Sequence, residues 1–249
     1  MRLTLAQPRT PGELIAATFA VFRTHATVFF TMSLVLVAPV TIVIDGIWGR
    51  ALADGADAKI PQAATLTAVL LQVIVIAPIA IALHAACLDA MTRGQEPHAG
   101  SAVRAAAPSL VPSVAAMALA SVGIGLGLLL LVVPGLYLAV RWYLVAVATS
   151  VEEAGPRAAL RRSAQLVDGR WWFTSGRIIL AALVFGLVAL VGQLVAVATG
   201  SGFLFVSLLA ITQAVALSLS AIFAILLFHD LRARRDHAAP ADLTHPERP

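Results

Sequence analysis

The chain has 249 residues, of which 60% are hydrophobic and only 12% are charged, and its mean hydropathy is +0.92. Soluble globular domains carry about a quarter charged residues, so this composition excludes that class and predicts a membrane protein. The net charge of +4 comes from arginines beside apolar runs, which favours a membrane surface over nucleic acid as the partner.

The first predicted element is an amphipathic helix that begins at Pro11. Thr10 can cap this helix, Pro11 suits its first position, and Glu13 can complete a capping box. An apolar stripe follows, made of Ile15, Phe19 and Phe22. Such a stripe is typical of a helix that lies in the membrane interface. Residues 1–10 are predicted to be a disordered cytoplasmic lead.

Long uncharged runs predict six membrane spans, because about 20 apolar residues cross the hydrocarbon core. Residues 24–44 and 60–88 are each long enough for one span. Residues 105–151, with Arg141 as the one charge, and residues 178–229 are each long enough for two. The predicted spans cover about 26–48, 65–90, 110–133, 136–151, 176–199 and 203–228. Pro78 is expected to kink the second span, and Pro134-Gly135 to turn the chain before the fourth.

A second amphipathic segment, Gly155 to Val167, lies between the fourth and fifth spans. The predicted fold is therefore all-α: a polytopic bundle of six transmembrane helices with short amphipathic interfacial helices. One membrane domain covers residues 11–231, and residues 232–249 are predicted to be a disordered cytoplasmic tail. A third apolar stripe lies before span 3, at Val103, Ala107 and Leu110. A threefold repeat, in which each unit is a surface helix followed by a helical hairpin, therefore stays open as an alternative.

The arginines predict the orientation of the bundle. Fourteen of them fall on the side that holds both termini and the 2–3 and 4–5 connections, whereas only Arg50 and Lys59 fall on the other. Because positive residues are retained inside, both termini are predicted to be cytoplasmic.

Arg141 is the most costly residue of the predicted spans, since a mid-span arginine costs about 2.5 to 3.5 kcal/mol. It lies roughly 9 Å inward from the Pro134-Gly135 turn at about 1.5 Å per residue. Asp45 lies at a similar depth in span 1, so an intramembrane ion pair between Asp45 and Arg141 is predicted. Binding of an anionic ligand by Arg141, and snorkelling of its side chain to the outer surface, stay open as alternatives.

Basic and aromatic residues gather between spans 4 and 5: Arg157, Arg161, Arg162, Arg170, Trp171 and Trp172. A basic residue near an anionic surface contributes about 1 kcal/mol, and tryptophans belong to the interfacial belt. We therefore expect contact with anionic lipid headgroups, with a purely topological role as the alternative. Glu152 and Glu153 just before this segment point about 100 degrees apart on a helix. They are expected to pair with these arginines, not to perform acid–base chemistry.

Catalytic and metal-binding patterns are not recognisable in this sequence. Cys87 is the only cysteine and His84 stands alone in its span, so neither a cofactor nor a metal is predicted. The leading function is a non-catalytic integral membrane protein that organises lipid or a partner protein, with a homo-oligomer left open. The alternative is a small transporter or permease for an amphiphilic or lipid substrate, which would need a midplane cavity formed by Gln72, His84, Gln193 and Gln213.

Several short motifs together resemble a known family. They are Pro11-Gly12-Glu13-Leu14, the run 134–141, Glu152, Gly155, and the runs 159–163 and 166–172. These residues look like the membrane domain attached to some bacterial glycerophosphoryl diester phosphodiesterases, which also occurs alone in uncharacterised actinobacterial membrane proteins. Ala164 and Asp168 depart from the family pattern. The resemblance implies a bacterial cell membrane, but the chain has no room for the phosphodiesterase barrel of about 250 residues, so no catalysis is expected.

Overall fold

The computed structural model of the chain describes residues 8–53, 66–199 and 202–236, and the side chains of 8–43, 66–199 and 202–235. Every element in these ranges is a helix, and six helical segments are long and apolar enough to cross a membrane. They are Ala26–Val43, Leu66–Thr92, Ala99–Leu130, Val132–Glu152, Trp171–Ala198 and Phe203–Arg235. The predicted all-α fold with six spans is confirmed.

Helix α1 (Pro11–Thr24) is the predicted amphipathic helix, and it begins with the predicted capping box. The Glu13 backbone N–H donates to the Thr10 hydroxyl at 3.3 Å, and the Thr10 backbone N–H donates to the Glu13 carboxylate at 2.7 Å. Hydrogen bonds from Thr10 favour the charged carboxylate and hold the pKa of Glu13 below its usual value. The buried side of α1 carries Leu14 and Val21 and packs mainly against α10.

The first two spans are α2 (Ala26–Ala53) and a helical segment that ends with α4 (Ala77–Thr92). A five-residue π-helix, η1 (Gln72–Ile76), comes directly before α4. Pro78 stands in the first turn of α4, where its missing N–H would break the regular ladder. A wider π turn accommodates that loss, and the predicted kink at Pro78 stays a prediction.

Helix α5 (Ala99–Leu130) is continuous and includes Pro108 and Pro112. The third predicted amphipathic stretch is therefore the first part of a long helix and not a separate surface helix. Helix α6 (Val132–Arg141) folds back against α5 after an extended residue, Leu131. The predicted turn at Pro134-Gly135 is therefore wrong, since both residues lie inside α6 and the chain turns at Leu131. A Cβ added at Gly127 would lie 3.0 Å from the Cα of Gly135, so these two glycines permit the close approach.

The sequence predicts one continuous helix for the fourth span, but the structure divides it into two. Helix α6 ends at Arg141, and α7 (Val145–Glu152) begins only after a turn over residues 142–144. Residues Leu144 to Thr149 are fully buried. The fourth span is thus a broken helix whose second half lies in the core of the bundle.

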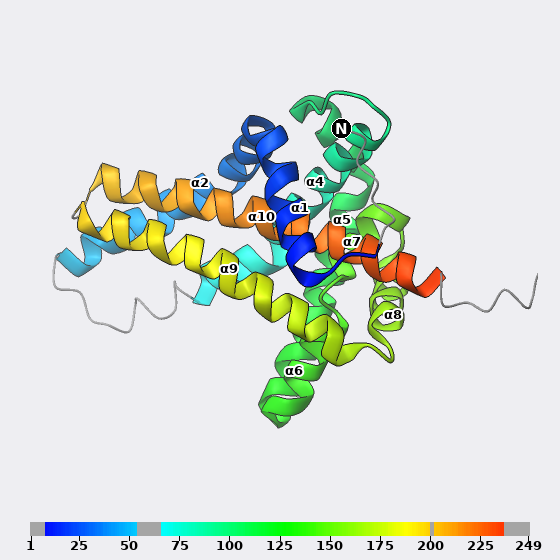
Figure 1. Ribbon diagram of the computed structural model, residues 1–249. Helices are drawn as coiled ribbons and strands as arrows, with labels where there is room; N and C mark the ends of the chain where they lie inside the picture. Colours follow the sequence, from blue (N-terminus) through cyan, green and yellow to red (C-terminus); the bar gives the residue numbers. More distant parts are fainter. Residues whose placement is uncertain (1–7, 54–65, 200–201, 237–249) are drawn as a thin grey trace, which may run out of the picture.

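The last three helices are α8 (Pro156–Val167), α9 (Trp171–Ala198) and α10 (Phe203–Asp236). Helix α10 is the centre of the bundle, since it contacts α2, α9, α4 and α1 (Figure 1). Its segment from Ala221 to Phe228 is almost completely buried. The helix continues to Asp236, beyond the predicted end of the membrane domain at Leu231.

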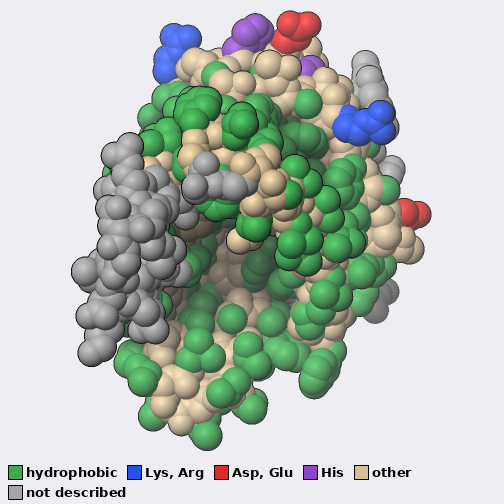
Figure 2. Space-filling model, turned by 90° about the vertical axis from the view of Figure 1, so that its left-hand side faces the viewer, with side chains coloured by type: hydrophobic (Ala, Val, Ile, Leu, Met, Phe, Trp, Pro, Cys, Tyr) green, Lys and Arg blue, Asp and Glu red, His purple; other side chains and the backbone are tan. Residues whose placement is uncertain are grey.

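The surface agrees with a membrane environment. Figure 2 shows the molecule from the left-hand side of Figure 1, where hydrophobic side chains are spread over the described part of the face and around a hollow. The charged side chains visible there lie at its upper and right-hand edges. Large apolar residues such as Leu129, Leu183 and Phe203 are exposed, as expected for helices that face lipid.

Candidate functional site

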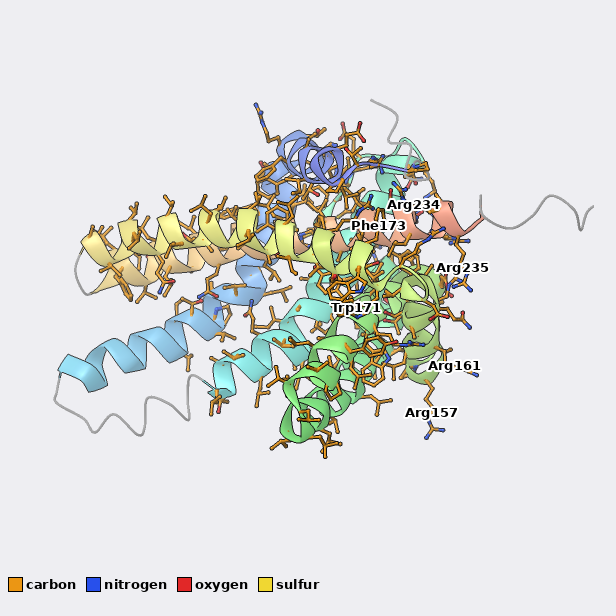
Figure 3. All side chains as sticks on the ribbon, turned by 60° about the horizontal axis from the view of Figure 1, so that its bottom comes forward. Arg157, Arg161, Trp171, Phe173, Arg234 and Arg235 are labelled. Carbon is orange, nitrogen blue, oxygen red and sulfur yellow. The ribbon has the colours of Figure 1, made fainter. Side chains whose placement is uncertain are left out.

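One end of the bundle holds most of the contacts between charged groups, and we call it the basic end. It is formed by residues 8–10, by α8, by the first turns of α9 and by the last turns of α10. Figure 3 shows the arginines Arg157, Arg161, Arg234 and Arg235 at this end. The start of the described chain and the end of α10 meet here, as expected for an even number of spans.

Helix α8 presents arginines of two kinds. Arg162 binds Glu152 through two of its nitrogen atoms at 2.9 to 3.0 Å, and Arg232 lies 3.7 Å from the same carboxylate. Arg157 and Arg161 are exposed and point away from the bundle (Figure 3). Neither of these two forms an ion pair with a described residue. The predicted pairing of Glu152 with the arginine run is confirmed for Arg162.

Ser163 on α8 fills the break in the fourth span. Its hydroxyl donates to the carbonyl of Arg141 at 2.8 Å and accepts from the backbone N–H of Leu144 at 3.2 Å. The broken helix leaves both backbone groups without hydrogen-bond partners in the helix, and the hydroxyl of the buried Ser163 takes the place of those partners. The break in the fourth span is therefore held by a side chain of the protein itself.

Arg141 lies at the basic end, beside the start of α9. Its guanidinium donates to the hydroxyl of Tyr137 at 2.6 Å and lies 4.0 Å from the carboxylate of Asp168. The side chain of Asp45 is outside the described residues, so the predicted ion pair between Asp45 and Arg141 stays a prediction. Tyr137 and Asp168 already give Arg141 two polar neighbours.

A buried ionic cluster, which the sequence reasoning missed, joins α9, α10 and the start of the chain. Asp230 is 0% exposed, and its side chain accepts hydrogen bonds from Arg177, from Arg234 at 2.9 Å and from the backbone N–H of Arg9 at 2.6 Å. Arg177, itself 2% exposed, and Arg234 both donate to the carbonyl of Arg9. We call this set, Arg9, Arg177, Asp230 and Arg234, the Asp230 cluster.

Phe173 holds the two guanidinium groups of the cluster in place. Its ring centroid lies 3.9 Å from the guanidinium carbon of Arg177 and 5.0 Å from that of Arg234. Cations over an aromatic face are attracted by the ring quadrupole. The sequence contained one signal for this cluster, because Arg177 and Asp230 are the first charges at the two ends of the uncharged run 178–229. A hairpin of two spans brings such ends together.

An open surface pocket of about 720 Å³, which we call the cavity, adjoins the Asp230 cluster. It is lined by Pro8, Gly169, Arg170, Trp171, Trp172, Phe173 and Arg234. Two arginines and three aromatic residues therefore line one space, and no carboxylate residue is among those that line it. Such a lining suits an anionic and partly apolar ligand.

The predicted lipid-contact residues divide between this cavity and the surface of α8. Arg170 donates to the carbonyl of Arg234 at 3.2 Å, and Trp171 donates from its indole to the carbonyl of Tyr137 at 3.2 Å. Trp172 packs edge-on against Trp171 and is 84% exposed. Arg170, Trp171 and Trp172 thus belong to the cavity, whereas Arg157, Arg161 and Arg162 lie on α8.

The polar residues proposed for a transport cavity do not share one environment. His84 is fully buried, stacks on Phe29, contacts the hydroxyl of Ser33 at 3.4 Å and bonds its own helix at the carbonyl of Ala80. Gln193 is exposed on the outside of α9. The histidine is part of a packed contact between α2 and α4, as expected for a structural residue.

Within the described ranges, no group of three or more His, Cys, Asp or Glu side chains could hold a metal ion. Cys87 is buried beside the sulfur of Met32 at 3.8 Å. These contacts are those of packing residues.

The fold and the basic end define a class, that of all-α multi-pass membrane proteins with a positively charged rim at one end of the bundle. Comparison of the chain with family models, with curated proteins and with solved structures finds no match. The resemblance to the phosphodiesterase-associated membrane domain therefore stays a prediction.

Proposed function

We propose that the chain is a non-catalytic integral membrane protein that gathers anionic lipid at its basic end. The observation that carries this proposal is the exposure of Arg157 and Arg161, whose side chains point away from the bundle. Other arginines of the same end have carboxylate partners, namely Arg162, Arg177, Arg232 and Arg234, but these two leave their charge to the surroundings. Anionic headgroups supply the opposite charge at a membrane surface.

The exposed Trp172 supports a location of the basic end in the membrane interface, where indole rings are favoured. The sorting of fourteen arginines to one side supports the cytoplasmic leaflet of the cell membrane, which carries the anionic lipids. The resemblance to a bacterial membrane domain agrees with this location. The proposed role is the organisation of lipid around the bundle, without chemistry of its own.

Reporter fusions test the orientation. A reporter that is active only in the cytoplasm should be active when joined after Gly155 or at the C-terminus and inactive when inserted between Arg50 and Lys59. Activity of an external reporter at Gly155 would overturn the cytoplasmic placement of the basic end.

Lipid extraction tests the function. The protein is extracted from the membrane with its surrounding lipid in polymer-bounded discs, and the ratio of phosphatidylglycerol to phosphatidylethanolamine is compared with that of the whole membrane. We expect enrichment of phosphatidylglycerol for the wild type and loss of that enrichment for Arg157→Glu with Arg161→Glu. Arg50→Glu with Lys59→Glu reverses two charges on the predicted opposite side and is the matched control. Equal enrichment in all three proteins would refute the proposal.

A further inference from the structure

The cavity at the basic end differs from the surface of α8 because its arginines are fixed in place. Arg234 is held by Asp230, by the carbonyl of Arg9 and by the ring of Phe173. Arg170 is held by its hydrogen bond to the carbonyl of Arg234. Groups that are already ordered lose little conformational freedom when a ligand binds, so they suit a specific site.

The charge around the cavity is not balanced by the described carboxylates. Asp230 is shared by Arg177 and Arg234. Arg170 forms no ion pair with any residue of the described ranges. The nearby Asp168 lies within ion-pair distance of Arg141. An excess of positive charge therefore faces the cavity, and an anion would neutralise it.

The Asp230 cluster also shows that its guanidinium groups can converge on a single oxygen atom. Arg177 and Arg234 both donate to the carbonyl oxygen of Arg9. Phosphate oxygens accept hydrogen bonds from guanidinium groups in the same way and with greater strength, because they carry charge. Of these two arginines, Arg234 lines the cavity, together with Arg170.

The size and the aromatic lining favour a lipid over a free phosphate ion. A cavity of about 720 Å³ is within the range of sites for small organic molecules, and a phosphate alone would fill only part of it. Trp171 and Trp172 line the same cavity, and indole rings pack against the glycerol and first methylene groups of interfacial lipids. Trp171 is anchored by its hydrogen bond to Tyr137 and by its stacking on the Tyr137 ring.

We propose that this cavity binds one glycerophospholipid with an anionic headgroup. Arg170 and Arg234 contact the phosphodiester, and Trp171 and Trp172 pack on the glycerol region. This site deepens the proposed function and rests on it, because both place the basic end in contact with lipid. The site is separate from the exposed arginines of α8. It predicts a single tightly held lipid in addition to any looser enrichment.

Native mass spectrometry of the full-length protein in mild detergent tests the site, with dioleoyl phosphatidylglycerol as the added probe. We expect one lipid per protein chain for the wild type and about tenfold weaker binding for Arg170→Gln, because a charge-assisted contact to phosphate is lost. Trp172→Ala changes an exposed side chain and tests the site without disturbing the packed core, and it should also weaken binding. Arg157→Gln with Arg161→Gln should leave the single bound lipid unchanged.

Further arms separate the possible ligands. A short-chain phosphatidylglycerol should displace the bound lipid, and inorganic phosphate at the same concentration should not. Displacement by that concentration of phosphate would assign the cavity to a free anion. Wild-type binding by both Arg170→Gln and Trp172→Ala would overturn the site. If only the α8 variant loses lipid, the proposed function survives and the cavity site falls. If only Arg170→Gln and Trp172→Ala lose lipid, the cavity site survives and the proposed role of the exposed α8 arginines falls.

Discussion

The basic end contains two groups of arginines that differ in what surrounds them. Arg177 is buried and has Asp230 as its partner, whereas Arg157 is exposed and forms no ion pair within the described chain. A buried arginine is tolerated only with a partner, because desolvation of an unpaired charge costs several kcal/mol. An exposed arginine at a membrane interface carries little desolvation cost and can attract anionic lipid headgroups. The first group should therefore support the fold, and the second should support function.

The largest effect is expected from Asp230→Asn, which leaves Arg177 buried without a charged partner. Breaking a buried pair by removal of one member costs about 3 to 5 kcal/mol. The thermal midpoint of unfolding in detergent should fall strongly, and less protein should reach the membrane. Asp168→Asn, which changes a carboxylate with a side chain 70% exposed, is the control and should behave like the wild type. Equal midpoints for both variants would remove the distinction between the two groups of arginines.

Ser163→Ala is expected to have the second largest effect. The substitution leaves the carbonyl of Arg141 and the N–H of Leu144 without their partner, at a cost of about 1 to 3 kcal/mol. The unfolding midpoint should fall, and hydrogen exchange should rise at Leu144. Ser101→Ala removes an exposed hydroxyl that bonds only its own helix and should leave both quantities unchanged. Unchanged exchange at Leu144 in Ser163→Ala would show that α8 does not hold the break.

Ser218→Ala tests a buried polar contact inside the spans. The Ser218 hydroxyl lies 2.8 Å from that of Ser33 and 3.1 Å from the carbonyl of Phe29, so it joins α10 to α2. Hydrogen bonds between membrane helices contribute about 0.6 kcal/mol on average and at most about 1.7 kcal/mol. A double-mutant cycle with Ser33→Ala should therefore give a small coupling energy. A coupling as large as the loss in Asp230→Asn would contradict the order proposed here.

The smallest effect on stability is expected from Arg157→Gln with Arg161→Gln. Exposed substitutions of this kind change the free energy of unfolding by less than about 0.5 kcal/mol. The unfolding midpoint should therefore match that of the wild type, while the enrichment of phosphatidylglycerol should fall. A clear loss of stability would mean that these two arginines belong to the fold and not to a lipid-binding surface.

Local features of the fold could be predicted because their causes lie within short stretches. The capping box at Thr10 and Glu13 needs only four consecutive residues, and each span needs only a long apolar run. The broken fourth span could not be predicted in this way. The backbone groups at its break bind Ser163, which follows Leu144 by 19 positions and reaches it only when α8 packs against α7.

The candidate site was predictable in part. Arg170, Trp171 and Trp172 stand together in the sequence, and the structure places all three on one cavity. Arg234 completes that cavity from α10, and it lay in the segment predicted to be a disordered tail. Phe173 gave no signal, because its importance comes from two guanidinium groups on different helices.

By itself, the sequence determined that hydrocarbon surrounds most of this protein, since uncharged runs of this length have no other stable environment. It also determined the capping box that begins α1 and the number of spans. Only the tertiary structure decided which arginines are buried and which face the surroundings. That choice depends on whether a carboxylate from a distant helix arrives beside the arginine, and the packing of α9 on α10 brings Asp230 to Arg177 but leaves Arg157 outside.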